Sequence, residues 1–151
     1  MMLKYKSLLV AGSLLLSSMV SANCELSIDR VLKVYDGDTI HAKLKSSCGE
    51  LPDVFGKKMG IRVFGIDTPE IRGSKCRQEK ILATEAKMLL KRTLLNADKV
   101  ELVDVRKGKY FRLVADVLVD GVSVTYYLFE EGLAVPYFGG TKTMDWCGAI
   151  K

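Results

Sequence analysis

Hydrophobic residues recur at nearly every second position in several stretches of the first half of the chain, a period typical of β-strands. Residues 28–35 and 38–45 are rich in branched and aromatic side chains, and Asp36-Gly37 between them is typical of a two-residue hairpin turn. Residues 61–66 follow a polar loop and predict a third strand, which a nearby proline ends because it cannot donate a ladder hydrogen bond. We therefore expect a hairpin followed by a third strand.

The hydrophobic period changes to that of a helix over residues 78–97, where leucines and alanines recur three or four positions apart. Two further strands are predicted at 99–105 and 110–119, followed by a short helix at 123–131 that Gly132 ends. Strands, one long helix, more strands and a short helix suit a small antiparallel barrel with a helix over its open end. Among such folds the five-stranded oligonucleotide-binding (OB) barrel fits best.

The first 22 residues are predicted to be a secretory signal peptide and not part of the fold. Lys4 and Lys6 precede an uncharged apolar run over residues 7–20, and small residues then stand where signal peptidase cuts, after Ala22. A membrane anchor is the alternative, but the run is shorter than the ~20 apolar residues that span a bilayer. We expect export to the periplasm or the medium, with residues 23–151 as one domain.

All four cysteines lie in the part expected to be exported, so two disulfides are predicted. The sequence contains no C-x-x-C pair, and this absence disfavours a zinc site. With a two-residue hairpin turn, Cys24 lies one step from facing Cys48, and a β-bulge would bring the two thiols together. The expected pairs are Cys24–Cys48 and Cys76–Cys147.

The composition restricts the classes of function and partner that the chain can have. The chain is 48% hydrophobic and 27% charged, enough to build a core, and its formal net charge of +5 is compatible with a polyanionic partner. Its one histidine excludes chemistry that needs two, such as a paired-histidine acid and base.

Polar residues gather in three segments: 36–39, 62–70 and 109–112. Each alone has a simpler explanation, namely a hairpin turn, the end of a strand and a solvated edge. Together they supply carboxylates for a hard oxygen site, which suits Ca²⁺, and the forked guanidinium groups of Arg62 and Arg112, which match phosphate oxygens. These are the parts that a phosphodiester hydrolase needs.

The order and spacing of these motifs resemble the staphylococcal nuclease (thermonuclease) family. The match extends from about residue 31 to 137, and its most specific feature is the five-residue step from Arg62 to Asp67 with the adjoining Thr-Pro-Glu. The resemblance implies a Ca²⁺-dependent nuclease on an OB-fold barrel that cleaves DNA and RNA, leaving a 3′-phosphate and a 5′-hydroxyl. Residues 23–151 would be this nuclease domain.

The resemblance also implies roles for individual residues. Asp38 and Asp67 would bind calcium through their carboxylates, and Thr68 would bind it through its backbone carbonyl. Glu70 would orient or deprotonate the attacking water. Arg62 and Arg112 would hold the phosphate and stabilise the transition state. Lys109, Tyr110 and Tyr137 would flank the substrate.

The chain departs from the family's type member in its tail and its cysteines. Only about 14 residues follow Tyr137 and they do not predict the type member's terminal helix, while the type member has no disulfide. The main alternative is a non-catalytic, exported nucleic-acid-binding barrel, and a second is an exported structural or calcium-binding module. Neither requires so many carboxylates and arginines in one motif set, so catalysis is favoured. We expect a monomer that binds DNA and RNA and has no stable protein partner.

Overall fold

The computed structural model describes residues 23–148 except 54, 56 and 57. The main elements within these residues follow the order β1 (Leu26–Val34), β2 (Thr39–Ser46), β3 (Met59–Val63), β4 (Ile66–Asp67), α2 (Arg77–Leu95), β5 (Val100–Lys107), β6 (Arg112–Val119), β7 (Val122–Ser123), α3 (Val124–Glu130) and β8 (Val135–Pro136). Both predicted helices and all five predicted main strands are present, with shifted ends.

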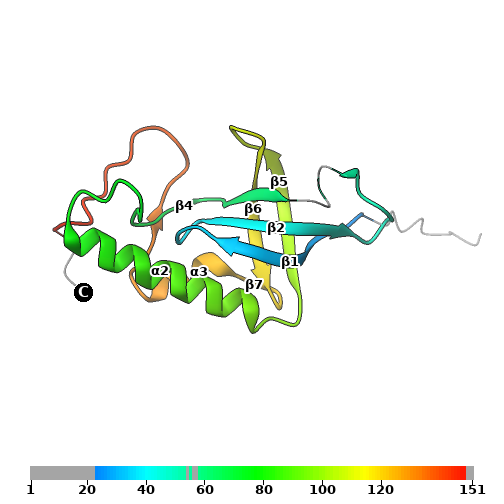
Figure 1. Cartoon of the computed structure of the whole chain (residues 1–151), viewed down its shortest axis with the longest axis horizontal. Coiled ribbons are helices and arrows are strands. Elements are labelled where there is room, and N and C mark those ends of the chain that lie inside the picture. Colours follow the sequence, from blue (N-terminus) through cyan, green and yellow to red (C-terminus); the bar gives the residue numbers. More distant parts are fainter. Residues whose placement is uncertain (1–22, 54, 56–57, 149–151) are drawn as a thin grey trace, which may run out of the picture.

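Five strands close into a barrel. They follow the order β3-β2-β1-β5-β6, and a parallel pairing between β3 and β6 closes the ring (Figure 1). The short β7 extends from β6, while β4 pairs with β8 in a separate two-stranded sheet. The expected five-stranded OB fold is confirmed.

Helix α2 lies along one side of the barrel, next to α3 (Figure 1). Its residues at helical spacing are buried in the common core, which explains the period seen in the sequence: Leu82, Ala86, Leu90 and Leu94. The helix begins after Cys76, whose Sγ accepts a hydrogen bond from the Glu79 backbone N–H. The start of α2 is therefore fixed beside the loop that follows β4.

The β1–β2 hairpin differs from the prediction. Its turn has three residues, since the Tyr35 N–H donates to the Thr39 carbonyl at 2.8 Å, so the two-residue turn is wrong. Two irregularities in β1 then shift the register, and Leu26 lies opposite Ser46. A β-bulge was expected to bring Cys24 opposite Cys48, and these register shifts have that effect.

Two predicted strands also have different ends. The third strand does not continue to residue 66: it turns at Phe64–Gly65, where Gly65 has a φ of +79°, and the chain resumes as β4. The strand predicted to begin at residue 110 begins at Arg112, because Tyr110 and Phe111 both have left-handed backbone conformations. Such conformations cannot continue a β-ladder.

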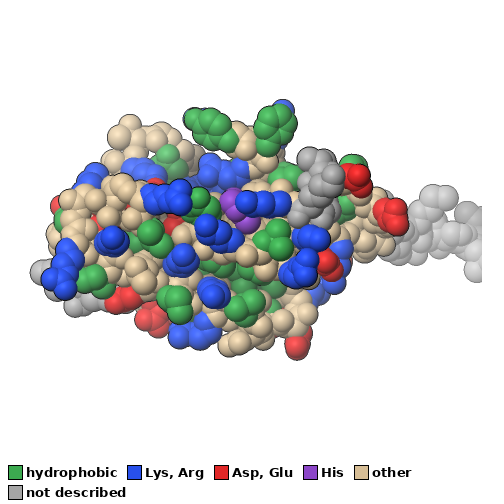
Figure 2. All heavy atoms as spheres, in the orientation of Figure 1, with side chains coloured by type: hydrophobic (Ala, Val, Ile, Leu, Met, Phe, Trp, Pro, Cys, Tyr) green, Lys and Arg blue, Asp and Glu red, His purple; other side chains and the backbone are tan. Residues whose placement is uncertain are grey.

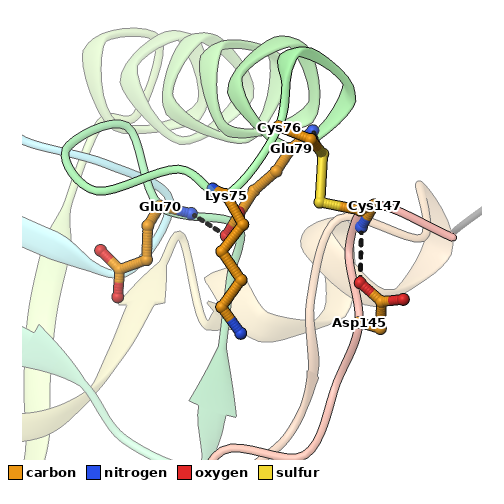
Figure 3. Close-up of a disulfide and its surroundings, with 6 residues drawn as sticks. All are labelled: Glu70, Lys75, Cys76, Glu79, Asp145 and Cys147. Carbon is orange, nitrogen blue, oxygen red and sulfur yellow. Dashed lines mark hydrogen bonds between the residues drawn. A yellow bond between two sulfur atoms is a disulfide. The ribbon is translucent and has the colours of Figure 1, made fainter.

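Two disulfides cross-link the domain. Cys24 bonds to Cys48 with a Cα–Cα distance of 5.3 Å, and Cys76 bonds to Cys147 with a Cα–Cα distance of 6.0 Å (Figure 3). The first bond ties the N-terminal end of β1 to the loop after β2, and the second ties the tail after β8 to the start of α2. The residues of the expected signal peptide lie outside the described part of the chain. Among the described residues, no helix combines the length and apolarity needed to cross a bilayer.

The two disulfides are expected to contribute unequally to stability. They close loops of 24 and 71 residue steps, which the chain-entropy model converts to about 3.5 and 4.4 kcal/mol. Replacing Cys76 and Cys147 by serine should therefore lower the free energy of unfolding more than the same change at Cys24 and Cys48. Urea titrations of the two double variants measure both losses, and the reverse order would contradict the expectation.

Candidate active site

Two buried carboxylates lie where the β1–β2 turn packs against Thr68, the residue that follows β4. Asp38 ends the turn and Asp67 ends β4, and they are 2% and 3% exposed. Gly37 permits this approach, since a Cβ at its position would lie 2.8 Å from the Ala86 Cβ on α2 and 2.9 Å from the Thr68 Cβ. Thr68, itself buried, therefore packs directly against the turn that carries Asp38.

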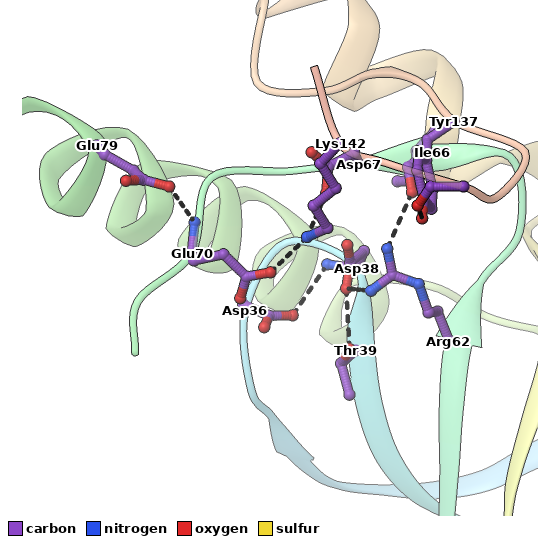
Figure 4. Close-up of polar contacts among 11 residues, drawn as sticks. Asp36, Asp38, Thr39, Arg62, Ile66, Asp67, Glu70, Glu79, Tyr137 and Lys142 are labelled. Atoms are coloured by element: carbon purple, nitrogen blue, oxygen red, sulfur yellow. Dashed lines mark hydrogen bonds and ion pairs between the residues drawn. The ribbon is translucent and has the colours of Figure 1, made fainter. Parts of the chain in front are cut away.

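Arg62 on β3 connects the turn before β2 with β4. Its Nη1 donates to Asp38 Oδ1 at 2.7 Å and its Nη2 donates to the Ile66 carbonyl at 3.3 Å (Figure 4). Burial raises the pKa of Asp38 to about 6, although the Arg62 guanidinium and the Thr39 hydroxyl act to lower it. Burial thus outweighs the Arg62 charge, and the Asp38 carboxyl takes up a proton more readily than an exposed aspartate would.

Lys142 reaches the same place from the C-terminal tail. Its ammonium lies 2.6 Å from Asp67 Oδ1 and 2.5 Å from Glu70 Oε1 (Figure 4). Burial acts to lower the pKa of Lys142, but the two carboxylates outweigh it and the pKa is raised. Lys142 was not predicted, because the local sequence of the tail carries no signal for a contact with Glu70, which lies 72 residues earlier.

Glu79 holds the loop that carries Glu70. This buried carboxylate on the first turn of α2 accepts hydrogen bonds from the backbone N–H of Glu70 at 3.4 Å and of Lys75 at 2.6 Å (Figure 3). Glu79 was not predicted either. Its signal was its place three residues after the N-cap, where an acidic side chain reaches back to the preceding loop.

Arg112 begins β6, the strand that pairs with β3 to close the barrel. It pairs with Gly60, two residues before Arg62, and its buried Nε has no hydrogen-bond partner within the described structure. It also lines a groove of about 530 Å³ on the outside of the barrel. An unpaired buried guanidinium N–H is suited to an anionic acceptor that enters from this groove.

The three residues expected to flank the substrate are more exposed than Asp38 and Asp67. Lys109 and Tyr110 are exposed in the β5–β6 turn. Tyr137 follows β8, where its backbone N–H donates to the Gly65 carbonyl at 2.9 Å and its hydroxyl donates to the Gly140 carbonyl at 2.7 Å. Tyr137 therefore lies beside the turn between β3 and β4, with its hydroxyl bonded within its own tail.

The expected calcium ligands suit a hard cation. The buried Asp67 Oδ1 accepts no hydrogen bond of acceptable geometry from the described residues, although the Lys142 ammonium is close enough to form an ion pair with it. No group of three or more His, Cys, Asp or Glu side chains with metal-binding geometry occurs in the described part of the chain. The expected donor set contains only two carboxylates, and its third donor is the Thr68 carbonyl.

Comparisons with known proteins agree with this architecture. Residues 60–145, more than half of the chain, match the model of the family described as staphylococcal nuclease homologue. The protein described as endonuclease YncB from Bacillus subtilis (strain 168) is 33% identical over 126 residues, which cover 80% of this chain and 53% of the relative. The chain therefore spans about half the length of that relative. From its barrel and this match, the chain belongs to the staphylococcal nuclease homologue family.

Proposed function

We propose that the protein is a calcium-dependent nuclease that hydrolyses phosphodiester bonds in DNA and RNA. The observation that carries this proposal is that two buried carboxylates are each paired with a basic side chain, one with an arginine and one with a lysine. Asp38 bonds to Arg62, and Lys142 bridges Asp67 and Glu70. Family membership and the endonuclease relative add support.

Asp38, Asp67 and the Thr68 carbonyl would hold the calcium ion. All three donors are oxygens, and the two carboxylates are nearly inaccessible to water, which favours a bound cation between them. Calcium bound there would polarise the phosphate and balance its developing negative charge. The buried Asp67 Oδ1 already attracts one cation, the Lys142 ammonium at 2.6 Å, which supports a site suited to positive charge.

Glu70 would orient or deprotonate the attacking water. Its side chain is 40% exposed, and Glu79 holds its backbone. Arg62 and Arg112 would bind the phosphate, because their planar forks match its oxygens and neutralise charge that develops in the transition state. The expected products carry a 3′-phosphate and a 5′-hydroxyl.

Lys109, Tyr110 and Tyr137 would flank the phosphate and base of the substrate. The proposed catalytic residues would act on the phosphate and on the attacking water, which DNA and RNA share, and this supports action on both. Two disulfides are typical of oxidising compartments and support export after removal of residues 1–22. We retain the sequence-based prediction of a monomer without a stable protein partner.

A digestion assay tests the proposed function. Purified protein beginning at residue 23 is incubated with plasmid DNA and with RNA, in millimolar calcium and in excess chelator. Cleavage of both substrates with calcium, and none with chelator, is expected. New 5′-hydroxyl ends should accept label from a polynucleotide kinase without prior phosphatase treatment. Binding without cleavage would instead favour the non-catalytic barrel, and full activity in chelator would refute calcium dependence.

Lys142 is expected to compete with calcium for Asp67. In chelator, Lys142→Met should lower the free energy of unfolding by about 1 kcal/mol, a small value because the lysine side chain is 38% exposed. The same variant should bind calcium more tightly, since Asp67 no longer has a competing cation. Calcium titrations by calorimetry measure the affinity, and Lys91→Met on α2 is the control. Equal calcium affinities for Lys142→Met and the wild type would contradict this expectation.

A further inference from the structure

A groove leads away from the proposed catalytic site along the outside of the barrel, and we refer to it as the side groove. Its volume is about 530 Å³, and its lining includes Tyr35, His41, Lys58, Tyr110, Phe111 and Arg112. Gly60 forms part of its floor, where a Cβ would lie 3.6 Å from both the Arg112 Cγ and the His41 ring. Because Arg112 also belongs to the proposed catalytic site, the side groove opens next to the phosphate to be cleaved.

One wall of the side groove carries two exposed aromatic rings. Tyr110 and Phe111 are each 92% exposed, and their φ values are +57° and +54°. Two consecutive non-glycine residues in the left-handed region cost conformational energy, and burial of their rings does not offset this cost. Strain at an exposed aromatic pair points to a ligand that stacks on these rings.

The remainder of the lining is rich in positive charge. Lys58 and Arg112 line the groove, while Lys33 Nζ and Arg72 Cζ lie 4.5 Å and 5.1 Å from the centroid of the Tyr35 ring. Asp36 is the acidic residue in the lining. Figure 2 shows Lys and Arg side chains gathered around the purple histidine, with hydrophobic side chains projecting above them.

His41 lies near these cations, which disfavour its protonated form. Burial lowers the pKa of His41, and Lys58 and Lys33 lower it further. Its ring centroid lies 5.3 Å from that of Tyr35. The groove thus combines flat rings with surrounding cations, the combination by which proteins bind the bases and phosphates of an unpaired strand.

We propose that the side groove binds the nucleotide next to the cleaved phosphate, with its base stacked on Phe111 and Tyr110 and its phosphate paired with Lys58. This inference rests on the proposed function and adds Phe111 and Lys58 to the substrate-binding residues. A purely apolar ligand would leave Lys58 and Arg112 unmatched, and a simple anion would leave the two rings exposed. A nucleotide matches both.

Binding of a fluorescently labelled, eight-nucleotide single strand tests the proposal by anisotropy, in chelator so that no cleavage occurs. Phe111→Leu is expected to raise Kd about fivefold or more, since base stacking on an aromatic ring is lost, whereas Phe111→Trp should retain the wild-type affinity. The control is Tyr126→Leu, which removes an exposed ring on α3 outside the groove and should leave Kd unchanged.

Lys58→Gln tests the phosphate contact through salt dependence. Loss of one phosphate contact should reduce the slope of log K against log salt by about 0.7, while Lys91→Gln on α2 should leave the slope unchanged. Unchanged affinity in Phe111→Leu, or no binding of the strand by the wild type, would overturn the proposal. Digestion with calcium is measured separately, so cleavage by a wild type that fails these tests refutes the side groove and not the nuclease.

Discussion

Replacing Asp67 by alanine is expected to abolish calcium binding and nuclease activity together while the fold is retained. Asp67 is 3% exposed, and its carboxylate is one of two proposed to hold the metal, so Asp38 and one carbonyl would be left to bind it. Substitution of groups that merely orient metal ligands costs about 10–100-fold in affinity, so loss of a ligand should cost at least 100-fold.

The barrel should survive this change because Asp67 contributes to the β4–β8 pairing through its backbone. Calcium titration, plasmid digestion and far-ultraviolet circular dichroism measure the three properties, and Asp53→Ala at an exposed position between β2 and β3 is the control. If Asp67→Ala kept wild-type calcium affinity, this residue would not be a ligand. An unfolded variant would contradict the expected independence of fold and site.

Replacing Glu70 by glutamine is expected to lower turnover by about 10²–10⁴-fold while calcium affinity is unchanged. The amide has almost the same shape as the carboxylate but cannot take a proton from water. Because the Glu70 side chain is 40% exposed and Glu79 bonds to its backbone, the loop should keep its conformation. The substitution therefore separates proton transfer from metal binding.

Single-turnover cleavage of a labelled oligonucleotide at saturating calcium measures this effect, with Glu50→Gln as the control at an exposed position. Wild-type turnover in Glu70→Gln would remove this residue from the water-activating role. A parallel loss of calcium affinity would instead make Glu70 a metal ligand.

The barrel could be predicted because short stretches of the sequence carry the signals for its strands and helices. Alternating hydrophobic residues mark the strands, and the spacing of Leu82, Ala86 and Leu90 marks the buried face of α2. The main strand ends were not predictable to the residue. The turn between Tyr35 and Thr39 contains three residues because Gly37 packs closely against α2 and Thr68, a tertiary contact that the Asp-Gly pair does not reveal.

The site of Asp38, Arg62, Asp67 and Glu70 was expected from the resemblance to the staphylococcal nuclease family. In the structure Asp38 pairs with Arg62, and Lys142 bridges Asp67 and Glu70. Lys142 was not predicted. Its place depends on the path of the tail after β8, which passes the site before it reaches Cys147. Its contacts are set by distant parts of the chain, and no local period or turn signal encodes them.

The disulfide between Cys76 and Cys147 also determines the fate of a chain that a protease has cut. The β5–β6 turn presents Tyr110 and Phe111 almost fully to solvent, as a protease that cleaves after aromatic residues requires. A cut there divides the polypeptide between the two bonded cysteines, so both pieces remain covalently joined. In a compartment shared with proteases, the nicked molecule would persist as one particle until a reductant released its halves.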